Sequence, residues 1–146
     1  MNVVLDPSKL REIEFDPNCR VNTTDEVLLA QISANIRRGL PQARPYQPNN
    51  FTAVLVAGGP SLKMTEKDLV KAAWSGGKVI AVNGAYQWCI DRNIKPSAMV
   101  MMDAREFNSR FVETPVEGCH YLLASQCHPR AFELCEGRQT TIWHAI

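Results

Sequence analysis

Small or polar residues follow each of five short apolar runs in the sequence. These residues are Gly58-Gly59-Pro60-Ser61, Asn83-Gly84, Asp103, Ser125-Gln126 and His144. In an open α/β sheet, ligands bind beyond the carboxyl ends of the strands, so residues at these ends converge on one site. The chemistry to consider first is therefore phosphate binding by the glycine turn, with metal or hydroxyl binding by the carboxylate.

The turn Gly58-Gly59-Pro60-Ser61 is the candidate phosphate site. Glycines let a ligand approach backbone N–H groups, and the start of a following helix favours an anion. Ser61 adds a hydroxyl donor. The spacing matches neither the P-loop nor Gly-x-Gly-x-x-Gly. A tight strand-to-helix turn that needs glycine would explain the same residues.

Asn83 and Asp103 each have a functional and a structural interpretation. Asn83 either contacts a base or ribose edge or caps a helix over residues 85–92. Asp103 either holds Mg²⁺ beside phosphate oxygens or binds a ribose hydroxyl, and its structural alternatives are a helix cap and an ion pair with Arg105. We favour a function for Asp103, as the catalytic and metal-binding residue, because it shares one edge of the sheet with Gly59 and Asn83.

Ser125, Gln126 and Gly84 are further candidates for ligand binding at the same edge. Ser125 is not expected to be a hydrolase nucleophile, because Gly-x-Ser-x-Gly is absent. His128 precedes Pro129 and is expected to do no more than cap a helix.

The five cysteines are expected to be reduced, buried thiols, because no Cys-x-x-Cys and no signal peptide are evident. Cys119-His120 and Cys127-His128 could be read as four zinc ligands. They lie near opposite ends of one expected strand, about 26 Å apart. They therefore cannot share an ion.

Apolar runs without alternation indicate strands buried on both faces, as in a parallel sheet. The expected strands cover residues 53–57, 79–82, 98–102, 121–124 and 140–143. The expected helices between them cover residues 65–74, capped by Thr65, and residues 85–92, 105–112 and 129–135. This alternation predicts an α/β fold with right-handed crossovers and a doubly wound parallel sheet of about five strands.

Residues 1–50 are expected to form an N-terminal arm, and residues 51–146 the main domain. The arm carries one amphipathic helix, which begins after Thr24, places Val27, Leu28, Ile32 and Ile36 at helical spacing, and ends at Arg38. Residues 41–50 are rich in Pro, Gln and Asn and are expected to be a linker. The helix is expected to pack on the main domain, or alternatively on a partner, which would make a homo-oligomer.

The composition excludes several classes of protein. Sixteen basic and 15 acidic residues leave a net charge of +1, which argues against a broad nucleic-acid surface. No apolar run approaches the length needed to span a membrane. We expect a cytoplasmic protein with a small-molecule ligand.

Several of these segments carry a resemblance to a known family. The segments 54–62 and 79–83, and Ile94-Lys95-Pro96 leading to Asp103, resemble the MptE-like family, which includes archaeal hydroxymethylpterin pyrophosphokinases. The Gly-Pro-Ser-Leu turn, the strand ending in Asn and Ser125 are also similar to bacterial sialyltransferases that use a CMP-linked sugar. The resemblance covers about residues 51–146, which leaves the arm mostly outside it.

The resemblance implies a Rossmann-like nucleotide-binding domain. Gly59, Pro60 and Ser61 would lie at the phosphates, Asn83 at the nucleoside, and Asp103 at a metal or ribose. Family members commonly continue with another helix and strand, so this chain is expected to be cut short after residue 146.

Three functions stay open on these grounds. The first is a diphosphotransferase that uses ATP and magnesium. The second is a glycosyltransferase that uses a CMP or UDP sugar. The third is a non-catalytic binding or assembly module. A methyltransferase is a poorer match, because the glycine turn differs.

Overall fold

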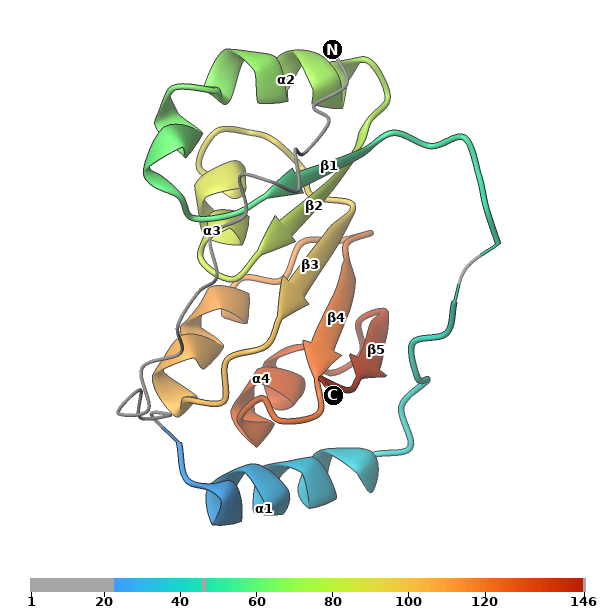
Figure 1. The fold of residues 1–146 in the computed structure, drawn as a ribbon, viewed down its shortest axis with the longest axis vertical. Coiled ribbons are helices and arrows are strands. Elements are labelled where there is room, and N and C mark those ends of the chain that lie inside the picture. The colour runs from blue at the N-terminus through green and yellow to red at the C-terminus, as the bar shows by residue number, and fades with distance from the viewer. Residues whose placement is uncertain (1–22, 46, 146) are drawn as a thin grey trace, which may run out of the picture.

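The computed structural model describes residues 23–45 and 47–145 and shows one five-stranded sheet (Figure 1). The strands are β1 (Ala53–Val56), β2 (Lys78–Val82), β3 (Ala98–Met101), β4 (His120–Ala124) and β5 (Thr140–Trp143). Every neighbouring pair is parallel, and the spatial order is β1-β2-β3-β4-β5. The expected Rossmann-like α/β fold is confirmed. The start of the arm, with Cys19, lies outside the described residues.

Helical segments connect the strands. They are η2 (Pro60–Lys63), α2 (Glu66–Trp74), α3 (Ala85–Ile90), η3 (Glu106–Val112) and α4 (Pro129–Leu134). The expected helix over residues 105–112 is a 3-10 helix. Thr65 does not cap α2 through its side chain, because its hydroxyl donates backward to Ser61 O and Leu62 O. His128 does cap α4, because its Nδ1 accepts from Arg130 N.

One face of the sheet carries all four connections. Right-handed crossovers between strands in sequential order put every connecting helix on the same side, and Figure 1 shows α2, α3 and α4 together beside the strands. Successive side chains of each strand point to opposite faces of the sheet. Those on the helix-covered face form the core. Its strand members include Val56, Val79, Ala81, Met99, Met101, Tyr121, Leu123 and Ile142.

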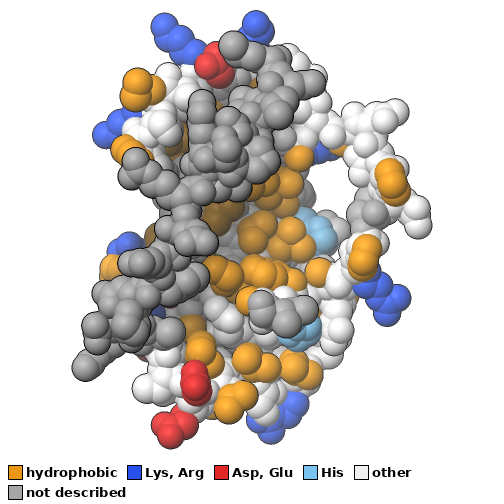
Figure 2. Space-filling view, in the orientation of Figure 1, with side chains coloured by type: hydrophobic (Ala, Val, Ile, Leu, Met, Phe, Trp, Pro, Cys, Tyr) orange, Lys and Arg blue, Asp and Glu red, His pale blue; other side chains and the backbone are white. Residues whose placement is uncertain are grey.

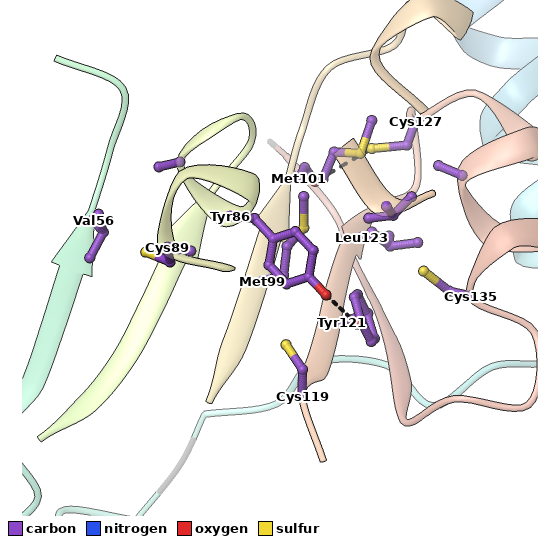
Figure 3. Close-up of a cluster of buried hydrophobic side chains, with 14 of the residues drawn as sticks. Val56, Tyr86, Cys89, Met99, Met101, Cys119, Tyr121, Leu123, Cys127 and Cys135 are labelled. Atoms are coloured by element: carbon purple, nitrogen blue, oxygen red, sulfur yellow. Dashed lines mark hydrogen bonds between the residues drawn. The ribbon is translucent and has the colours of Figure 1, made fainter. Parts of the chain in front are cut away.

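The core is closely packed, and its two buried tyrosine hydroxyls are paired. The hydroxyls of Tyr86 and Tyr121 lie 2.7 Å apart, and Val116 N donates to both. Four buried cysteines complete the packing, namely Cys89, Cys119, Cys127 and Cys135. Burial raises their thiol pKa to about 11 for Cys89 and Cys119 and about 12 for Cys127 and Cys135. These thiols point among apolar neighbours (Figure 3), so they act as small hydrophobic side chains.

The other face of the sheet has no helix over it in the part of the chain that the structure describes. Its strand residues are half-buried or exposed and include Leu55, Ile80, Val82, Val100, Leu122 and Trp143. Figure 2 shows hydrophobic side chains gathered over the strands. The sequence predicts a doubly wound sheet, which carries helices on both faces. The described residues differ from this expectation, because strands in sequential order with right-handed crossovers place their helices on one face.

The two edges of the sheet differ. The outer edge of β5 is covered by the linker, since Ala43 N donates to Ile142 O and Ile142 N donates to Pro41 O. The outer edge of β1 pairs with no strand among residues 23–45 and 47–145. Leu55 of β1 is 72% exposed there. The glycine turn that follows β1 therefore lies at the open edge of the sheet.

The arm helix α1 (Asp25–Ile36) lies beyond the carboxyl ends of β3 and β4 and packs against α4 (Figure 1). Thr24 caps it as expected, with its hydroxyl oxygen accepting from Val27 N. Its docking face was only partly anticipated: Val27 and Ile36 are exposed, and the buried residues are Gln31 and Asn35. Hydrophobic periodicity misses this face because its contacts are polar.

None of the helices in the described ranges combines the length and apolar character needed to cross a bilayer.

Candidate functional site

The turn after β1 has an ordinary backbone and open space around its glycines. Gly58 and Gly59 both lack a positive φ, and Gly59 is extended, with φ −78° and ψ 158°. Among the described residues, a Cβ at Gly58 would meet nothing within 4 Å, and one at Gly59 would meet only Ser61 Oγ at 3.8 Å. Neither the chain path nor the packing therefore requires glycine here. The interpretation as a turn that needs glycine therefore lacks support in the described residues, and close approach by a ligand stays a prediction.

The same turn presents free backbone donors. Gly59 N donates to Ala57 O and Leu62 N donates to Gly59 O. The N–H groups of Gly58 and Ser61 donate to no acceptor among the described residues. Unpaired N–H groups without a covering side chain are suited to oxygen atoms of an anion.

A pocket of about 240 Å³ separates this turn from the first turn of α3. It is lined by Gly58, Gly59, Pro60, Leu62, Lys63, Gly84, Ala85 and Trp88. Four of these were candidates from the sequence, whereas Lys63 and Trp88 were missed. Trp88 carries the guanidinium of Arg92 4.0 Å from its ring centroid. Trp88 lies one helical turn after Gly84, and no sequence motif marks it as a site residue.

A second cavity, of about 250 Å³, lies on the other side of the β2–α3 turn. It is lined by Thr23, Leu28, Asn83, Met102, Asp103, Ala104, Arg105 and Gln126. Three expected site residues meet here, namely Asn83, Asp103 and Gln126. One side of this cavity is formed by residues that follow β2, β3 and β4, and the other by Leu28 of α1. The arm is thus part of the wall of the cavity.

Asn83 does not cap α3. Gly84 occupies the N-cap position, without a side-chain hydrogen bond, and Asn83 contributes only its backbone oxygen, which accepts from Tyr86 N. The Asn83 residue has φ +48°, and its Oδ1 is buried without a hydrogen-bond partner in the described part of the chain. A buried acceptor without a donor costs about 1–3 kcal/mol. Asparagine adopts the left-handed region more readily than most residues, so the position has a structural explanation, and ligand contact by the side chain stays a prediction.

Asp103 is held by Arg105. The guanidinium donates from Nε to Oδ1 at 3.0 Å and from Nη2 to Oδ2 at 2.7 Å, and Arg105 N also donates to Oδ1 at 3.0 Å. These bonds, together with the buried amide of Asn108, hold the pKa of the Asp103 carboxyl well below its usual range. The side chain of Asp103 is 23% exposed and that of Arg105 is 50% exposed. The ion pair anticipated as an alternative is therefore present.

Ser125 lies under α1 and lines neither of the two cavities. Its Oγ is 3.0 Å from His144 Nδ1, and its backbone oxygen accepts from Asn35. Gln126 reaches the cavity, and its Nε2 donates to Met102 O. Ser61 faces a separate hollow of about 480 Å³ along the open edge of β1. The structure thus brings Asn83, Asp103 and Gln126 together and sets Ser61 and Ser125 to either side.

Two polar residues of α1 fasten it to this edge. Asn35 is fully buried, and its Nδ2 donates to Ser125 O at 2.9 Å and to Cys127 O at 2.7 Å. Gln31 donates from Nε2 to Ala104 O at 3.1 Å. No sequence motif marks either residue, because their partners are backbone carbonyls far along the chain.

Comparison with known proteins shows to which family this chain belongs. The family model described as 6-hydroxymethylpterin diphosphokinase MptE-like matches residues 27–146. The chain belongs to the MptE-like family. No curated protein and no solved structure gives a significant match to it. The matched segment begins inside α1, so the helix and linker expected to lie mostly outside the resemblance are part of the family domain.

The cavity lined by Asn83, Asp103 and Gln126 lacks the cluster of side chains that would bind a metal ion in the described part of the chain. No group of three or more His, Cys, Asp or Glu side chains comes together within residues 23–45 and 47–145. Asp103 is the acidic side chain at the cavity, and both of its oxygens accept from Arg105. A carboxylate has about four lone-pair sites, and three of them are used by Arg105 alone. Magnesium therefore stays a prediction for this edge, and the donor set does not favour it.

Proposed function

We propose that the protein binds a nucleotide along the carboxyl edge of β1, β2 and β3. The observation that carries this proposal is the pair Gly58 and Gly59, which neither backbone conformation nor packing requires. Membership of the MptE-like family supports a pterin-kinase-like domain. The nucleotide phosphates would meet the free N–H groups of the turn, and Asn83 would accept a hydrogen bond from the nucleoside or from a second substrate.

The reaction that fits this family is transfer of a diphosphate from ATP to a hydroxymethyl group. The hydroxyl oxygen forms a bond to the β-phosphorus, the bond from that phosphorus to the oxygen bridging to the α-phosphate breaks, and AMP leaves. The hydroxyl proton passes to a base or to water. Such chemistry depends on positioning and on stabilising charge at the phosphoryl oxygens. Donors at the Gly58 turn and the guanidinium of Arg105 would provide that stabilisation.

Isothermal titration calorimetry with ATP, CTP, CMP-linked sugar and UDP-linked sugar tests the proposal, each with Mg²⁺ and with EDTA. We expect ATP to bind. Preference for a CMP or UDP sugar would favour the glycosyltransferase instead. Heat from none of these ligands would reject nucleotide binding and leave a binding or assembly module.

The variant Gly59→Ala sharpens the test. Because alanine fits this backbone and this space, we expect stability to be unchanged or raised by about 0.4–1 kcal/mol. We expect ATP affinity to fall at least about tenfold, because the added methyl group blocks approach to the N–H groups. Thermal unfolding and calorimetry measure the two effects.

Gly77→Ala is the matched control. A Cβ at Gly77 would lie 2.7 Å from Ala72 O and 3.0 Å from Val54 Cγ2. We expect a loss of about 1–3 kcal/mol in stability, with the ATP affinity of the folded protein unchanged. If Gly59→Ala instead lost stability and kept its affinity, Gly59 would be a structural residue and the proposal would lose its main support.

A further inference from the structure

The cavity beside Asp103 contains a preorganised guanidinium. Of the residues that line it, Asp103 and Arg105 are the charged ones. Two parallel hydrogen bonds, at 3.0 and 2.7 Å, hold the plane of the guanidinium against the carboxylate. A further bond from Arg105 N to the same carboxylate fixes the backbone on which the side chain stands.

Arg105 keeps donors to spare. A guanidinium has five N–H groups. Asp103 accepts from two of them, and the other three have no acceptor among the described residues. Half of the side chain is exposed at the cavity. The neighbouring Glu106 does not compete for it, because its carboxylate lies 4.0 Å from His128 Nε2 and its side chain is 69% exposed.

Asp103 has the opposite property, because three of its about four acceptor sites are taken. Oδ1 accepts from Arg105 N and Nε, and Oδ2 accepts from Nη2. The buried amide of Asn108 lies close enough to favour the ionised carboxyl as well. A cation placed on Asp103 would compete with the guanidinium for these oxygens.

We propose that Arg105 binds a phosphate group of the ligand, and that Asp103 is a positioning residue for Arg105 and not a metal ligand. This inference rests on the proposed nucleotide site. The forked guanidinium matches two phosphate oxygens. Parallel strands lie about 4.8 Å apart, so the ends of β1 and β3 are about 10 Å apart. A di- or triphosphate chain that starts at the Gly58 turn can reach Arg105 over that distance.

The experiment compares Arg105→Gln, Arg105→Lys and Asp103→Asn with Arg130→Gln. Arg130 is exposed at the start of α4 and does not line the cavity, so its substitution controls for loss of one positive charge. Each protein is titrated calorimetrically with ATP and with inorganic diphosphate, in EDTA and in Mg²⁺. Thermal unfolding confirms that each variant is folded.

We expect binding in EDTA, and a loss of about 10- to 100-fold in affinity for Arg105→Gln. Arg105→Lys keeps the charge but loses the fork, so it should recover only part of the affinity. Asp103→Asn should weaken binding equally with and without Mg²⁺. Arg130→Gln should bind as the natural chain does.

A spectroscopic measurement separates positioning from simple structural support. In ¹⁵N-labelled protein, the Arg105 Nε–H signal should exchange slowly with water because it is bonded to Asp103. We expect that signal to broaden or vanish in Asp103→Asn and to shift in the natural chain when diphosphate is added. An unchanged signal in both cases would overturn the positioning role.

Two further outcomes distinguish the proposals. Wild-type affinity in Arg105→Gln, combined with loss of Mg²⁺-dependent binding in Asp103→Asn, would overturn this inference and leave nucleotide binding standing. Diphosphate binding without ATP binding, still lost in Arg105→Gln, would sustain the inference and reject the nucleotide. Absence of binding for both probes would reject both.

Discussion

Replacing Leu123 by alanine should lower the free energy of unfolding by about 2–5 kcal/mol. Leu123 is fully buried in β4, on the face that the helices cover (Figure 3). Truncation removes buried methyl groups and leaves a cavity that the packed neighbours cannot close. Single domains are stable by only about 5–15 kcal/mol, so this variant should be close to unfolding. Urea denaturation followed by circular dichroism measures the loss.

Leu122 offers a matched control one residue earlier in the same strand. Its side chain lies on the opposite face of the sheet and is half-buried. We expect Leu122→Ala to cost clearly less than Leu123→Ala, because less apolar surface is removed from contact. An equal cost for the two variants would show that this second face is covered in solution, contrary to the arrangement of the described residues.

Replacing Asn35 by leucine should cost about 2–5 kcal/mol, although leucine is a good helix former and the more apolar side chain. The Asn35 amide is fully buried and donates to Ser125 O and Cys127 O. Leucine would leave both carbonyls buried without a donor, at about 1–3 kcal/mol each. Hydrogen exchange of the α1 amides should rise, because these bonds fasten the helix to the edge of the sheet.

Asn35→Asp adds a pH dependence with a definite sign. An ionised carboxylate here would be desolvated and would face two carbonyls that repel it, and the cation beside it is Arg38, whose Nε lies 3.3 Å from Asn35 Oδ1. Arg38 is partly exposed and also pairs with Glu133, so we expect burial and the carbonyls to outweigh it and to raise the folded-state pKa above the unfolded value of about 3.9. The folded state then binds more protons, and stability should increase as pH falls from 7 toward about 4. Once protonated, the carboxyl can donate to one carbonyl.

Ser33→Asp is the control for this series. Ser33 is on the same helix but exposed, so its carboxylate should stay solvated. We expect a small change in stability with no such rise at low pH. If Asn35→Leu and Asn35→Asp matched this control at pH 7, the polar docking of α1 would not hold in solution.

Much of the fold follows from short stretches of sequence. The runs Ala53–Val56 and Ala98–Met101 are continuous in apolar residues and end at turn-forming or polar ones, so each marks a strand and its carboxyl end. The expected burial of both faces is wrong for the described residues, because burial alternates along these strands and Leu55 is exposed. Thr24 marks the start of α1 for a similarly local reason, because its hydroxyl caps a backbone N–H three residues later. The parallel order of strands then put the candidate residues at one edge.

What local patterns could not supply are contacts between distant segments. Gln31 and Asn35 bind carbonyls 73 and 90 residues away, and such polar pairs leave no hydrophobic period to read. The interpretation of the Gly58 turn also needed three dimensions, because only the backbone angles and the space around each Cβ show that alanine would fit.

The sequence by itself determined a parallel α/β sheet and the presence of one carboxylate, Asp103, at the carboxyl edge where we expect a ligand. Only the tertiary structure decided that α1 packs at this edge, that Asn83 does not cap α3, and that Arg105 forms an ion pair with Asp103. The physical reason is the separation along the chain over which each interaction acts. Strand and turn preferences act over a few residues, whereas the partner of a polar side chain is set by where the whole chain brings its donors and acceptors.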